Sequence, residues 1–325
     1  MSTGVLLLTF GSAVTSADVP EYLQSVRGGR PAPDEVVAEF RRRYDRIGRS
    51  PLIDITEAQA HALQQSLEAE DGGGEYAVAV GMLHSAPRVA DAVAHLVAAG
   101  VDDIVAVVLA PQYSPIILSG YERATAAARE AYPGVTFHLA GAWHLTDGWI
   151  DSLAERVREG LERISAGDRD GVPVIFTAHS LPRSVVERDP GYIEQLQETA
   201  RAVASRTDLA PDRWQFAYQS AGHTPEEWLT PDVKDVLPAL RDGGHDTVLV
   251  APVQFLADHL EILYDIDVAA VEEAHQLELT MRRIEMPNTS PTFIAALAAV
   301  VRRERAARSY TRARVREGGH RPRRA

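Results

Sequence analysis

The chain has 325 residues, about twice the length of a typical domain, so its length predicts two domains that each bury a core. A composition of 45% hydrophobic and 24% charged residues is that of an ordinary soluble globular protein and excludes a largely disordered chain. The absence of cysteine excludes disulfides, thiolate metal sites and cysteine nucleophiles. No segment approaches the roughly 20 apolar residues that span a bilayer, and the apolar run at 5–8 follows no basic residue, so we expect a cytoplasmic protein without a signal peptide.

The formal charge of −13 is unevenly distributed along the chain. Residues 302–325 contain ten arginines and two glutamates, a charge of +8, which leaves −21 on residues 1–301. Because the body of the chain repels phosphates, we do not expect the protein as a whole to bind nucleic acid. We expect residues 307–325 to be a solvated, disordered tail, and weak attraction of this tail to an anionic membrane surface or to RNA stays open as an alternative.

Short apolar runs alternate with longer segments of helical periodicity, which is typical of a parallel α/β fold. The runs predict strands at 5–9, 76–80, 104–109, 135–140, 172–177, 214–218, 247–251 and 277–284. The segments between them predict helices at 33–46, 55–69, 87–99, 120–131, 149–164, 192–205 and 231–242. Eight strands divide as four plus four, so we expect two four-stranded parallel sheets flanked by helices.

The two halves of the chain repeat one order of features, which indicates a duplication. In each half, a histidine and a proline precede a helix, a Gly-x-Asp turn follows it, and an apolar strand then ends in Ala-Pro, at Pro111 and at Pro252. We therefore place one domain at residues 1–148 and a second at 149–290. We expect a C-terminal helix at 291–306 to pack back on the first domain.

Ligands of open parallel sheets bind beyond the carboxyl ends of the strands. In the second half these positions hold His179, the segment 219–223 and the segment 258–261. The sequence contains no P-loop, no G-x-G-x-x-G after a strand and no G-x-S-x-G, so nucleotide-driven and esterase functions are not supported. A histidine at a strand end can exchange protons near neutral pH or ligate a metal, although such a residue is structural about as often.

A set of regularly spaced acidic residues follows the last of these strand ends. If residues 258–273 form an α-helix, with 100° between successive residues, Asp258, Glu261, Asp265 and Glu272 lie on one stripe. A solvated helix face would explain the stripe, but it begins beside a strand end and is interrupted by apolar residues, so we expect part of it to face a cleft. Carboxylates bind divalent cations and carry protons, so the stripe is a candidate path for either.

Motifs in both halves together resemble those of the ferrochelatases. They are TAHSLP at 177–182, YQS and HTPEEWL within 218–229, PV at 252–253, DHLEILYDID at 258–267 and EMPN at 285–288, with RGGRP at 27–31, RYD at 43–45, SPL at 50–52 and LAPQYS at 109–114. The resemblance covers roughly residues 4–305 in order, and several motifs at compatible spacing are more specific than any one of them. Because the chain is short and has no cysteine for a cluster-binding extension, it most resembles the soluble bacterial coproporphyrin ferrochelatases.

The resemblance implies a fold of the class II chelatase type, with two Rossmann-like domains and a porphyrin cleft between them. It implies insertion of Fe²⁺ into a porphyrin in haem synthesis, with coproporphyrin III as the porphyrin and coproheme as the product. The alternatives are protoporphyrin IX as substrate, another metal such as Co²⁺ with a related tetrapyrrole, and a porphyrin or haem carrier without turnover. Fe²⁺ is then a substrate, no obligatory cofactor is implied, and other enzymes of the haem pathway are candidate partners.

The resemblance also assigns roles to individual residues. His179 is the metal-facing proton acceptor, Glu261 is its partner across the cleft, and Asp265 and Glu272 continue a path for protons or metal. Two N–H protons must leave a porphyrin as iron enters, so a base near the ring centre and a proton outlet are both required. The residues that the motifs imply for substrate binding are Phe10, Arg27, Arg30, Arg43, Ser50, Tyr121 and Tyr218.

The chain departs from the family pattern at several positions. Phe10 stands where many members have a tyrosine that can ligate iron, and Ala269 replaces a third carboxylate, for which Glu272 could substitute. Gly28 and His223 stand where relatives have arginine and asparagine. The first two departures are the reason for keeping the carrier without turnover as an alternative.

Overall fold

The computed structural model describes residues 3–70, 76–164, 171–222 and 226–318, so His223 and the last seven residues lie outside the described part of the chain. All eight expected strands are present, within a few residues of their expected bounds. The strands of the first half are β1 (Thr3–Thr9), β2 (Tyr76–Met82), β3 (Asp103–Val108) and β4 (Thr136–Leu139). Those of the second half are β5 (Val174–His179), β6 (Trp214–Gln219), β7 (Thr247–Pro252) and β8 (Thr280–Arg283).

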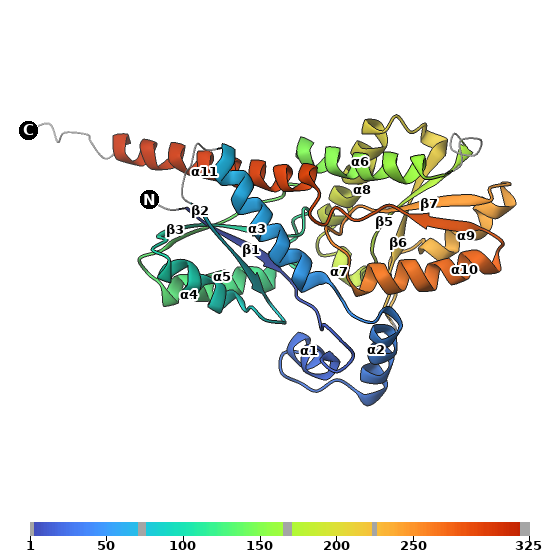
Figure 1. Ribbon diagram of the computed structural model, residues 1–325, viewed down its shortest axis with the longest axis horizontal. Coiled ribbons are helices and arrows are strands. Elements are labelled where there is room, and N and C mark those ends of the chain that lie inside the picture. Colours follow the sequence, from blue (N-terminus) through green and yellow to red (C-terminus); the bar gives the residue numbers. More distant parts are fainter. Residues whose placement is uncertain (1–2, 71–75, 165–170, 223–225, 319–325) are drawn as a thin grey trace, which may run out of the picture.

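Each half forms its own four-stranded parallel sheet, and the two sheets have the same topology (Figure 1). The order is β2-β1-β3-β4 in the first sheet and β6-β5-β7-β8 in the second. Every residue of β1 is buried, because helices cover both faces of the sheet. The expected α/β architecture of two four-stranded parallel sheets is confirmed.

Helices connect and flank the strands. Those that the periodicity predicts are α2 (Asp34–Ile47), α3 (Leu52–Glu70), α4 (Val89–Ala98), α5 (Ser119–Ala131), α6 (Asp147–Glu162), α8 (Gly191–Arg206) and α9 (Val233–Asp242). The expected domain boundary at 148–149 falls in the first turn of α6. Two short helices, α1 (Val19–Val26) and α7 (Arg183–Val186), were not expected, since eight and four residues are too few to display a helical period.

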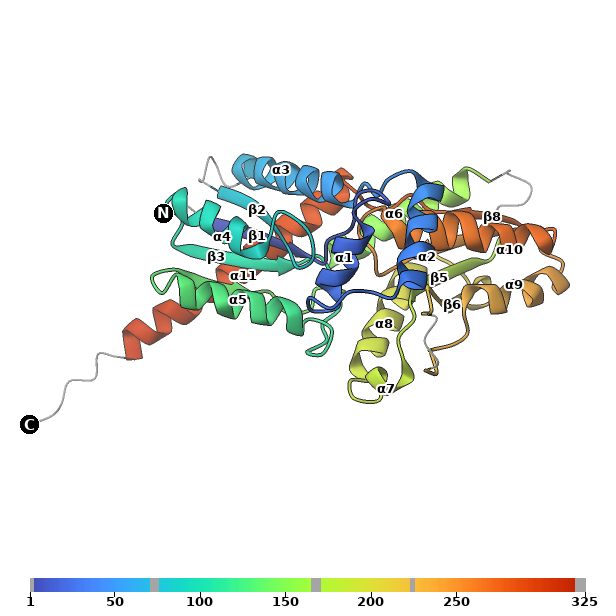
Figure 2. The same cartoon turned by 90° about the horizontal axis from the view of Figure 1, so that it is seen from below.

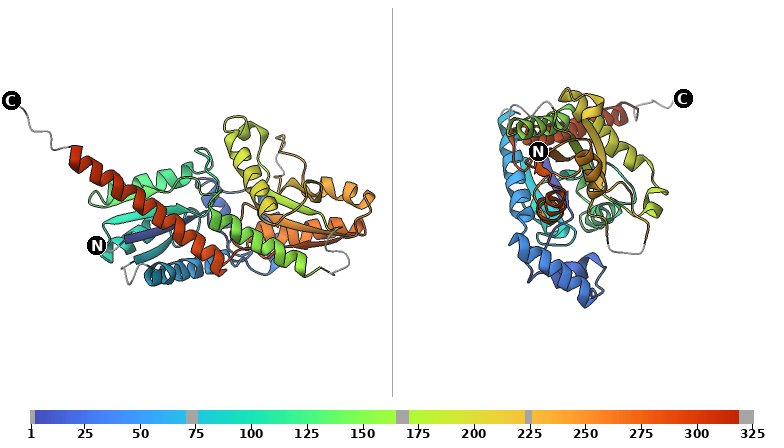
Figure 3. Two further views of the ribbon diagram at one scale, coloured as in Figure 1. Left: turned by 90° about the horizontal axis from the view of Figure 1, so that it is seen from above. Right: turned by 90° about the vertical axis from the view of Figure 1, so that its right-hand side faces the viewer.

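The C-terminal helix α11 (Pro291–Gly318) is longer than the sequence suggests. Its first half packs against α3 and α6 through fully buried side chains such as Phe293, Leu297 and Val301. It then crosses the first half of the molecule and ends outside it (Figures 2 and 3). The helix extends past residue 306, its expected end, because an Arg- and Ala-rich segment without an interrupting proline or glycine continues it to Gly318. Residues 319–325 of the expected tail lie outside the described part of the chain.

A π-helix follows β7 where the sequence suggests a single α-helix. This element, η3, runs over Glu261–Ala270 and continues as α10 (Val271–Gln276). The expected geometry of 100° per residue over 258–273 is therefore wrong. A π-helix bonds each N–H to the carbonyl five residues earlier, so its turns are wider and side chains seven or more residues apart no longer align as in an α-helix.

Hydrogen bonds join the two halves of the chain at two separate places. Gln59 in the first half donates to the backbone oxygen of Asn288, at 2.8 Å. At the second place the side-chain amide of Gln195, in the second half, accepts from the backbone nitrogen of Tyr113, in the first half, at 2.8 Å. The same amide donates to the backbone oxygen of Tyr113 at 3.0 Å. These bonds hold the carboxyl edges of the two sheets in one arrangement. No helix in the described ranges is long and apolar enough to cross a membrane.

Candidate functional site

A cavity of about 890 Å³ lies where the carboxyl ends of the two sheets meet. Its lining comes from the segments that follow β1, β3, β5, β6 and β7, and from α2 and η3. This is the position at which parallel sheets bind ligands, and the volume lies within the roughly 300–1,000 Å³ of small-molecule sites. Most of its wall is apolar, with Phe40, Ile117, Leu181 and Trp228 among the lining residues.

His179 ends β5 and lines this cavity. Its backbone nitrogen donates to Oε1 of Gln254 at 2.7 Å, and its Nδ1 is bonded to the backbone oxygen of Ser180. Because a carbonyl oxygen can only accept, Nδ1 carries a proton, and the neutral ring leaves Nε2 as an acceptor. In this tautomer Nε2 is the basic nitrogen of His179, and it lies on the side of Glu261.

Glu261 lies between two imidazoles. One carboxylate oxygen is 3.7 Å from Nε2 of His179 and 3.7 Å from Nε2 of His259. Burial would raise the pKa of Glu261, but positive charge on the neighbouring His179 and His259 rings when they are protonated, the hydrogen bond from His259 and the charge of Arg43 outweigh burial and lower this pKa to about 2. Glu261 is thus a carboxylate that stays ionised inside a largely apolar cavity.

His259 is a site residue to which the sequence assigned no role. Its Nδ1 donates to the backbone oxygen of Ala257 at 3.0 Å, so its Nε2, like that of His179, faces Glu261. Burial lowers the pKa of His259, but the Glu261 carboxylate and the Ala257 carbonyl favour the protonated ring, and the net effect is a raised pKa. The only sequence signal was its place two residues before Glu261 in the DHLE motif.

The four carboxylates that the sequence places on one stripe do not all face the cavity. Asp265 lines the cavity next to Glu261, and burial, together with the charge of Glu261, raises the pKa of Asp265. Glu272 does not line the cavity; its side chain is 62% exposed and pairs with Arg46 at 3.4 Å. Asp258 turns away to Arg283, at 3.2 Å. Glu272 is turned away by the wider turns of η3, and Asp258 lies before this helix begins, so only two of the four carboxylates line the cavity.

Arg43 lines the cavity but is engaged by carboxylates of the protein. Its guanidinium lies 2.8 Å from Glu39 and 3.3 Å from Asp265, and it stacks over the Tyr264 ring at 5.2 Å. A substrate carboxylate would therefore compete with Asp265 for this arginine.

Three further residues expected to bind substrate line the cavity. Arg27 follows α1, and its guanidinium has no hydrogen-bond or ion-pair partner among the described residues. Tyr121 is buried in the wall, and burial raises the pKa of its phenol. Phe10 is 44% exposed, and its ring lies 4.5 Å from that of His84. At Gly28 the backbone has φ of +65°, which disfavours a residue with a Cβ at this position.

The structure places three other expected substrate residues outside the cavity lining. Ser50 is buried behind the wall, where it accepts from Ser12 at 3.0 Å. Tyr218 is buried against Phe216, with 5.3 Å between the ring centroids. Arg30 is exposed and donates to the backbone oxygen of Arg27 at 3.3 Å. Sequence spacing could not reveal that Ser50 and Tyr218 turn away, since both are buried by tertiary packing, or that Arg30 extends into solvent.

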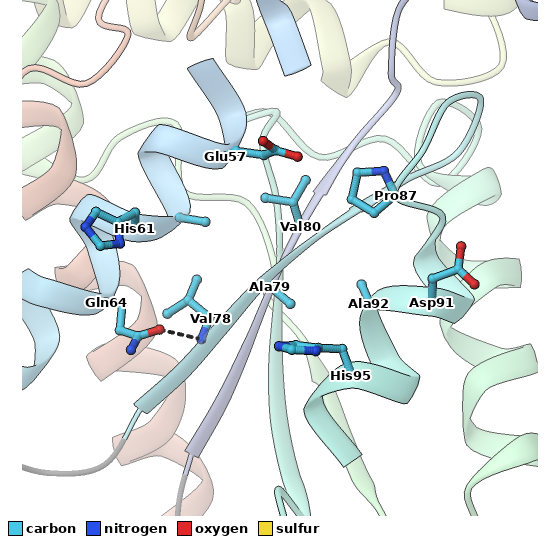
Figure 4. Close-up of a pocket in the computed structure, with 11 residues that line it drawn as sticks. Glu57, His61, Gln64, Val78, Ala79, Val80, Pro87, Asp91, Ala92 and His95 are labelled. Atoms are coloured by element: carbon cyan, nitrogen blue, oxygen red, sulfur yellow. Dashed lines mark hydrogen bonds between the residues drawn. The ribbon is translucent and has the colours of Figure 1, made fainter. Parts of the chain in front are cut away.

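A second, smaller cavity of about 360 Å³ lies at the outer edge of β2, between α3 and α4. Two helical pairs, Glu57 with His61 and Asp91 with His95, stand around it, and Figure 4 shows these four side chains spread apart rather than converging. Gln64 accepts from the backbone nitrogen of Val78 at 3.3 Å and so covers part of the strand edge. In the described ranges, no three His, Asp or Glu side chains form a set of metal ligands here or elsewhere.

Comparisons with known proteins identify the family of this chain. The family model described as Ferrochelatase matches residues 2–305. The ferrochelatase of Deinococcus radiodurans is 38% identical over 305 residues, which cover 93% of this chain and 96% of that protein. The coproporphyrin III ferrochelatases of Geobacillus thermodenitrificans and Bacillus subtilis are 35% and 33% identical, and each alignment covers 92% of this chain and 95% or 96% of the relative.

Solved structures show the same fold at low sequence identity. SirB from Bacillus subtilis with Fe³⁺ superposes with a TM-score of 0.56 at 14% identity, covering 94% of this chain and 96% of that one. DR2241 from Deinococcus radiodurans, described as structurally similar to chelatases, superposes with a TM-score of 0.52 at 12% identity and covers 92% of this chain and 54% of that one. With a family match across nearly the whole described chain and relatives above 30% identity, the chain belongs to the ferrochelatase family.

Proposed function

We propose that this ferrochelatase inserts Fe²⁺ into coproporphyrin III, giving coproheme in haem synthesis. The observation that carries the proposal is the base–carboxylate pair of His179 and Glu261, 3.7 Å apart in an otherwise largely apolar cavity. The relatives named coproporphyrin III ferrochelatase support this choice of porphyrin. Phe10, in place of a tyrosine, leaves an apolar ring at the mouth of the cavity.

The chemistry requires two protons to leave the porphyrin for each Fe²⁺ that enters. His179 offers Nε2 as the first acceptor, and the ionised Glu261 stabilises the imidazolium that results. Asp265, whose pKa is raised, is the next group that can take up a proton on the side of η3. The iron stays ferrous, the porphyrin nitrogens become its ligands, and the two protons pass to these side chains and then to solvent.

The cavity lining offers few arginines that could bind the carboxylates of a porphyrin. Arg27 and Arg43 are the arginines among the described lining residues, and Arg43 is shared with Glu39 and Asp265. We assign Arg27 as the main carboxylate anchor, because a guanidinium without a protein partner can donate two parallel N–H bonds to a substrate carboxylate.

Anaerobic incubation of the purified protein with Fe²⁺ and either coproporphyrin III or protoporphyrin IX tests the proposed function. We expect metalation of coproporphyrin III well above the protein-free rate and a lower kcat/KM for protoporphyrin IX, which has two fewer carboxylates. Tight porphyrin or haem binding without metalation of either substrate would instead identify a carrier. Faster metalation of protoporphyrin IX would overturn the choice of porphyrin but not the reaction.

Replacing Arg27 by glutamine should raise KM for coproporphyrin III roughly 10-fold or more with little change in kcat. A hydrogen bond to a charged group contributes about 1.5–3 kcal/mol, which corresponds to this range. Steady-state metalation kinetics measure the effect. Arg41→Gln is the matched control, because Arg41 lies on α2 outside the cavity lining and donates to the backbone oxygen of Ser16. Equal KM values for the two variants would remove Arg27 from the substrate site.

The basic end of the chain supports a weak membrane contact. Residues 308–325 contain seven arginines and one glutamate, and α11 carries the first of them beyond the acidic body. Each arginine near an anionic bilayer contributes about 1 kcal/mol of attraction. We expect the full chain to sediment with phosphatidylglycerol vesicles but not with phosphatidylcholine vesicles, and 0.5 M salt, about five times ordinary buffer strength, to abolish sedimentation. A chain ending at Ala307 should sediment with neither. If the two chains behave alike, the contact does not exist.

A further inference from the structure

A fully buried glutamine links the strand that carries His179 to the helix that carries Glu261. Gln219 ends β6, is paired with His179 in the sheet register, and is 2% exposed. Its side-chain oxygen lies 2.7 Å from Oγ1 of Thr177, two residues before His179 on β5. Its side-chain nitrogen lies 3.3 Å from the backbone oxygen of Glu261. Gln219 does not line the cavity, so it acts on the site only through these neighbours.

The orientation of this amide follows from its partners. The backbone oxygen of Glu261 can only accept, so the NH₂ group of Gln219 must face it. The amide oxygen then faces Thr177, whose hydroxyl donates to it. Both ends of the side chain therefore have suitable partners, and at this depth water does not replace them.

A second contact connects the Gln219 side chain to Asp265 through Ser220. The Gln219 nitrogen also lies 3.4 Å from Oγ of Ser220, and the Ser220 hydroxyl is bonded to the Asp265 carboxylate. Ser220 has φ of +60°, a conformation that residues other than glycine seldom adopt. Such strain persists only where surrounding contacts hold it, and it places the Ser220 hydroxyl against η3.

We propose that Gln219 is a positioning residue that sets the separation between the His179 ring and the carboxylates of Glu261 and Asp265. The inference rests on the proposed function of these residues. The 3.7 Å between His179 and Glu261 depends on how η3 sits against the end of β5, and Gln219 is the side chain that bonds to both elements. Gln219 is not part of the cavity lining that His179 and Glu261 share, so loss of its hydrogen bonds should change the geometry of proton transfer and leave the binding surface in place.

Replacing Gln219 by leucine tests this role, with metalation of coproporphyrin III by Fe²⁺ as the assay. We expect kcat to fall roughly 10- to 100-fold, the range found for residues that orient reactive groups, while KM for the porphyrin stays within about 2-fold. Gln112→Leu is the matched control. Gln112 is 1% exposed and also bonds to a threonine hydroxyl, that of Thr199 at 3.1 Å, but it lies outside the cavity lining and contacts neither His179 nor Glu261.

Thr177 provides a second pair of variants if Gln219→Leu does not fold. Thr177→Val removes the hydroxyl that orients the Gln219 amide while keeping the shape, and should lower kcat about 3- to 10-fold. Thr177→Ser keeps the hydroxyl and should restore kcat to near the wild-type value.

The outcomes distinguish failure of the proposed positioning role of Gln219 from failure of the proposed metalation reaction. Wild-type protein that does not metalate any porphyrin refutes the proposed function. If the wild type metalates and Gln219→Leu matches Gln112→Leu in kcat, or if Thr177→Val equals Thr177→Ser, the positioning role is refuted and the reaction stands. A rise in KM at constant kcat would also refute it, because the residue would then act on binding.

Discussion

Replacing His179 by alanine should lower kcat for iron insertion by roughly 10²- to 10⁴-fold, the usual contribution of a general base. The Nδ1 proton of His179 is held by the Ser180 carbonyl, which leaves Nε2 as the free basic nitrogen on the Glu261 side of the cavity. Without it, the group that we propose as the first acceptor of the porphyrin N–H protons is missing. Anaerobic metalation of coproporphyrin III, followed by the change in porphyrin absorbance, measures the loss.

Two further measurements make the His179→Ala result specific. KM for the porphyrin should change little, because the apolar wall and Arg27 remain in place. His95→Ala, on α4 at the second cavity, should metalate at the wild-type rate, since it removes an imidazole far from the cleft. If His179→Ala retains more than about a tenth of wild-type kcat, a factor worth only 1.4 kcal/mol, His179 is not the base.

Replacing Glu261 by glutamine should lower kcat by roughly 10²-fold or more, because it removes a negative charge that stabilises the His179 imidazolium inside a poorly solvated cavity. The substitution keeps size and hydrogen-bonding capacity, so the loss reports the charge. Glu273→Gln is the control, because Glu273 is exposed on α10 and lies outside the cavity lining. Wild-type kcat in Glu261→Gln would remove Glu261 from the reaction.

The same substitution should lower the pKa of His259. In the wild type, burial lowers this pKa and the Glu261 charge more than compensates, so removing the charge leaves burial in control. NMR titration of the imidazole measures the shift, which Glu273→Gln should not reproduce. An unchanged His259 pKa would mean that the two groups are not coupled.

The contributions of Glu261 and His259 to the free energy of unfolding should change with pH in opposite directions. The pKa of Glu261 is about 2 in the folded protein, below its ordinary value of 4.5. Its contribution to the free energy of unfolding is therefore present above pH 4.5 and is lost as pH falls towards 2. The raised pKa of His259 gives a contribution that is present below its ordinary value of 6.5 and is lost as pH rises through the raised value. In Glu261→Gln both contributions should be missing from pH-dependent denaturant unfolding.

Much of the fold could be predicted because the strands of parallel sheets are local signals. A strand buried on both faces, such as β1 or β7, is a short apolar run in any tertiary context. The repeat of strand, helix and Ala-Pro predicted the duplication that the identical strand orders display. The position of His179 at a strand end and of Glu261 after another strand followed from the same pattern.

Only the tertiary structure decided which side chains meet in the cavity. A π-helix has no sequence period that distinguishes it from an α-helix, so the expected stripe divides. Glu261 and Asp265 line the cavity, Glu272 forms an exposed ion pair, and Asp258, before the helix, forms a largely buried one. The engagement of Arg43 by Asp265 joins residues 222 positions apart, and the bridge from Gln219 to Glu261 joins residues 42 apart. The sequence by itself predicted the strands, most of the helices and the family, and the resemblance to that family proposed His179 and Glu261 as a pair, because these depend on local periodicity and motif spacing. Packing between distant segments determined the partners of each charge, because a hydrogen bond or an ion pair depends on distance in space and not on distance along the chain.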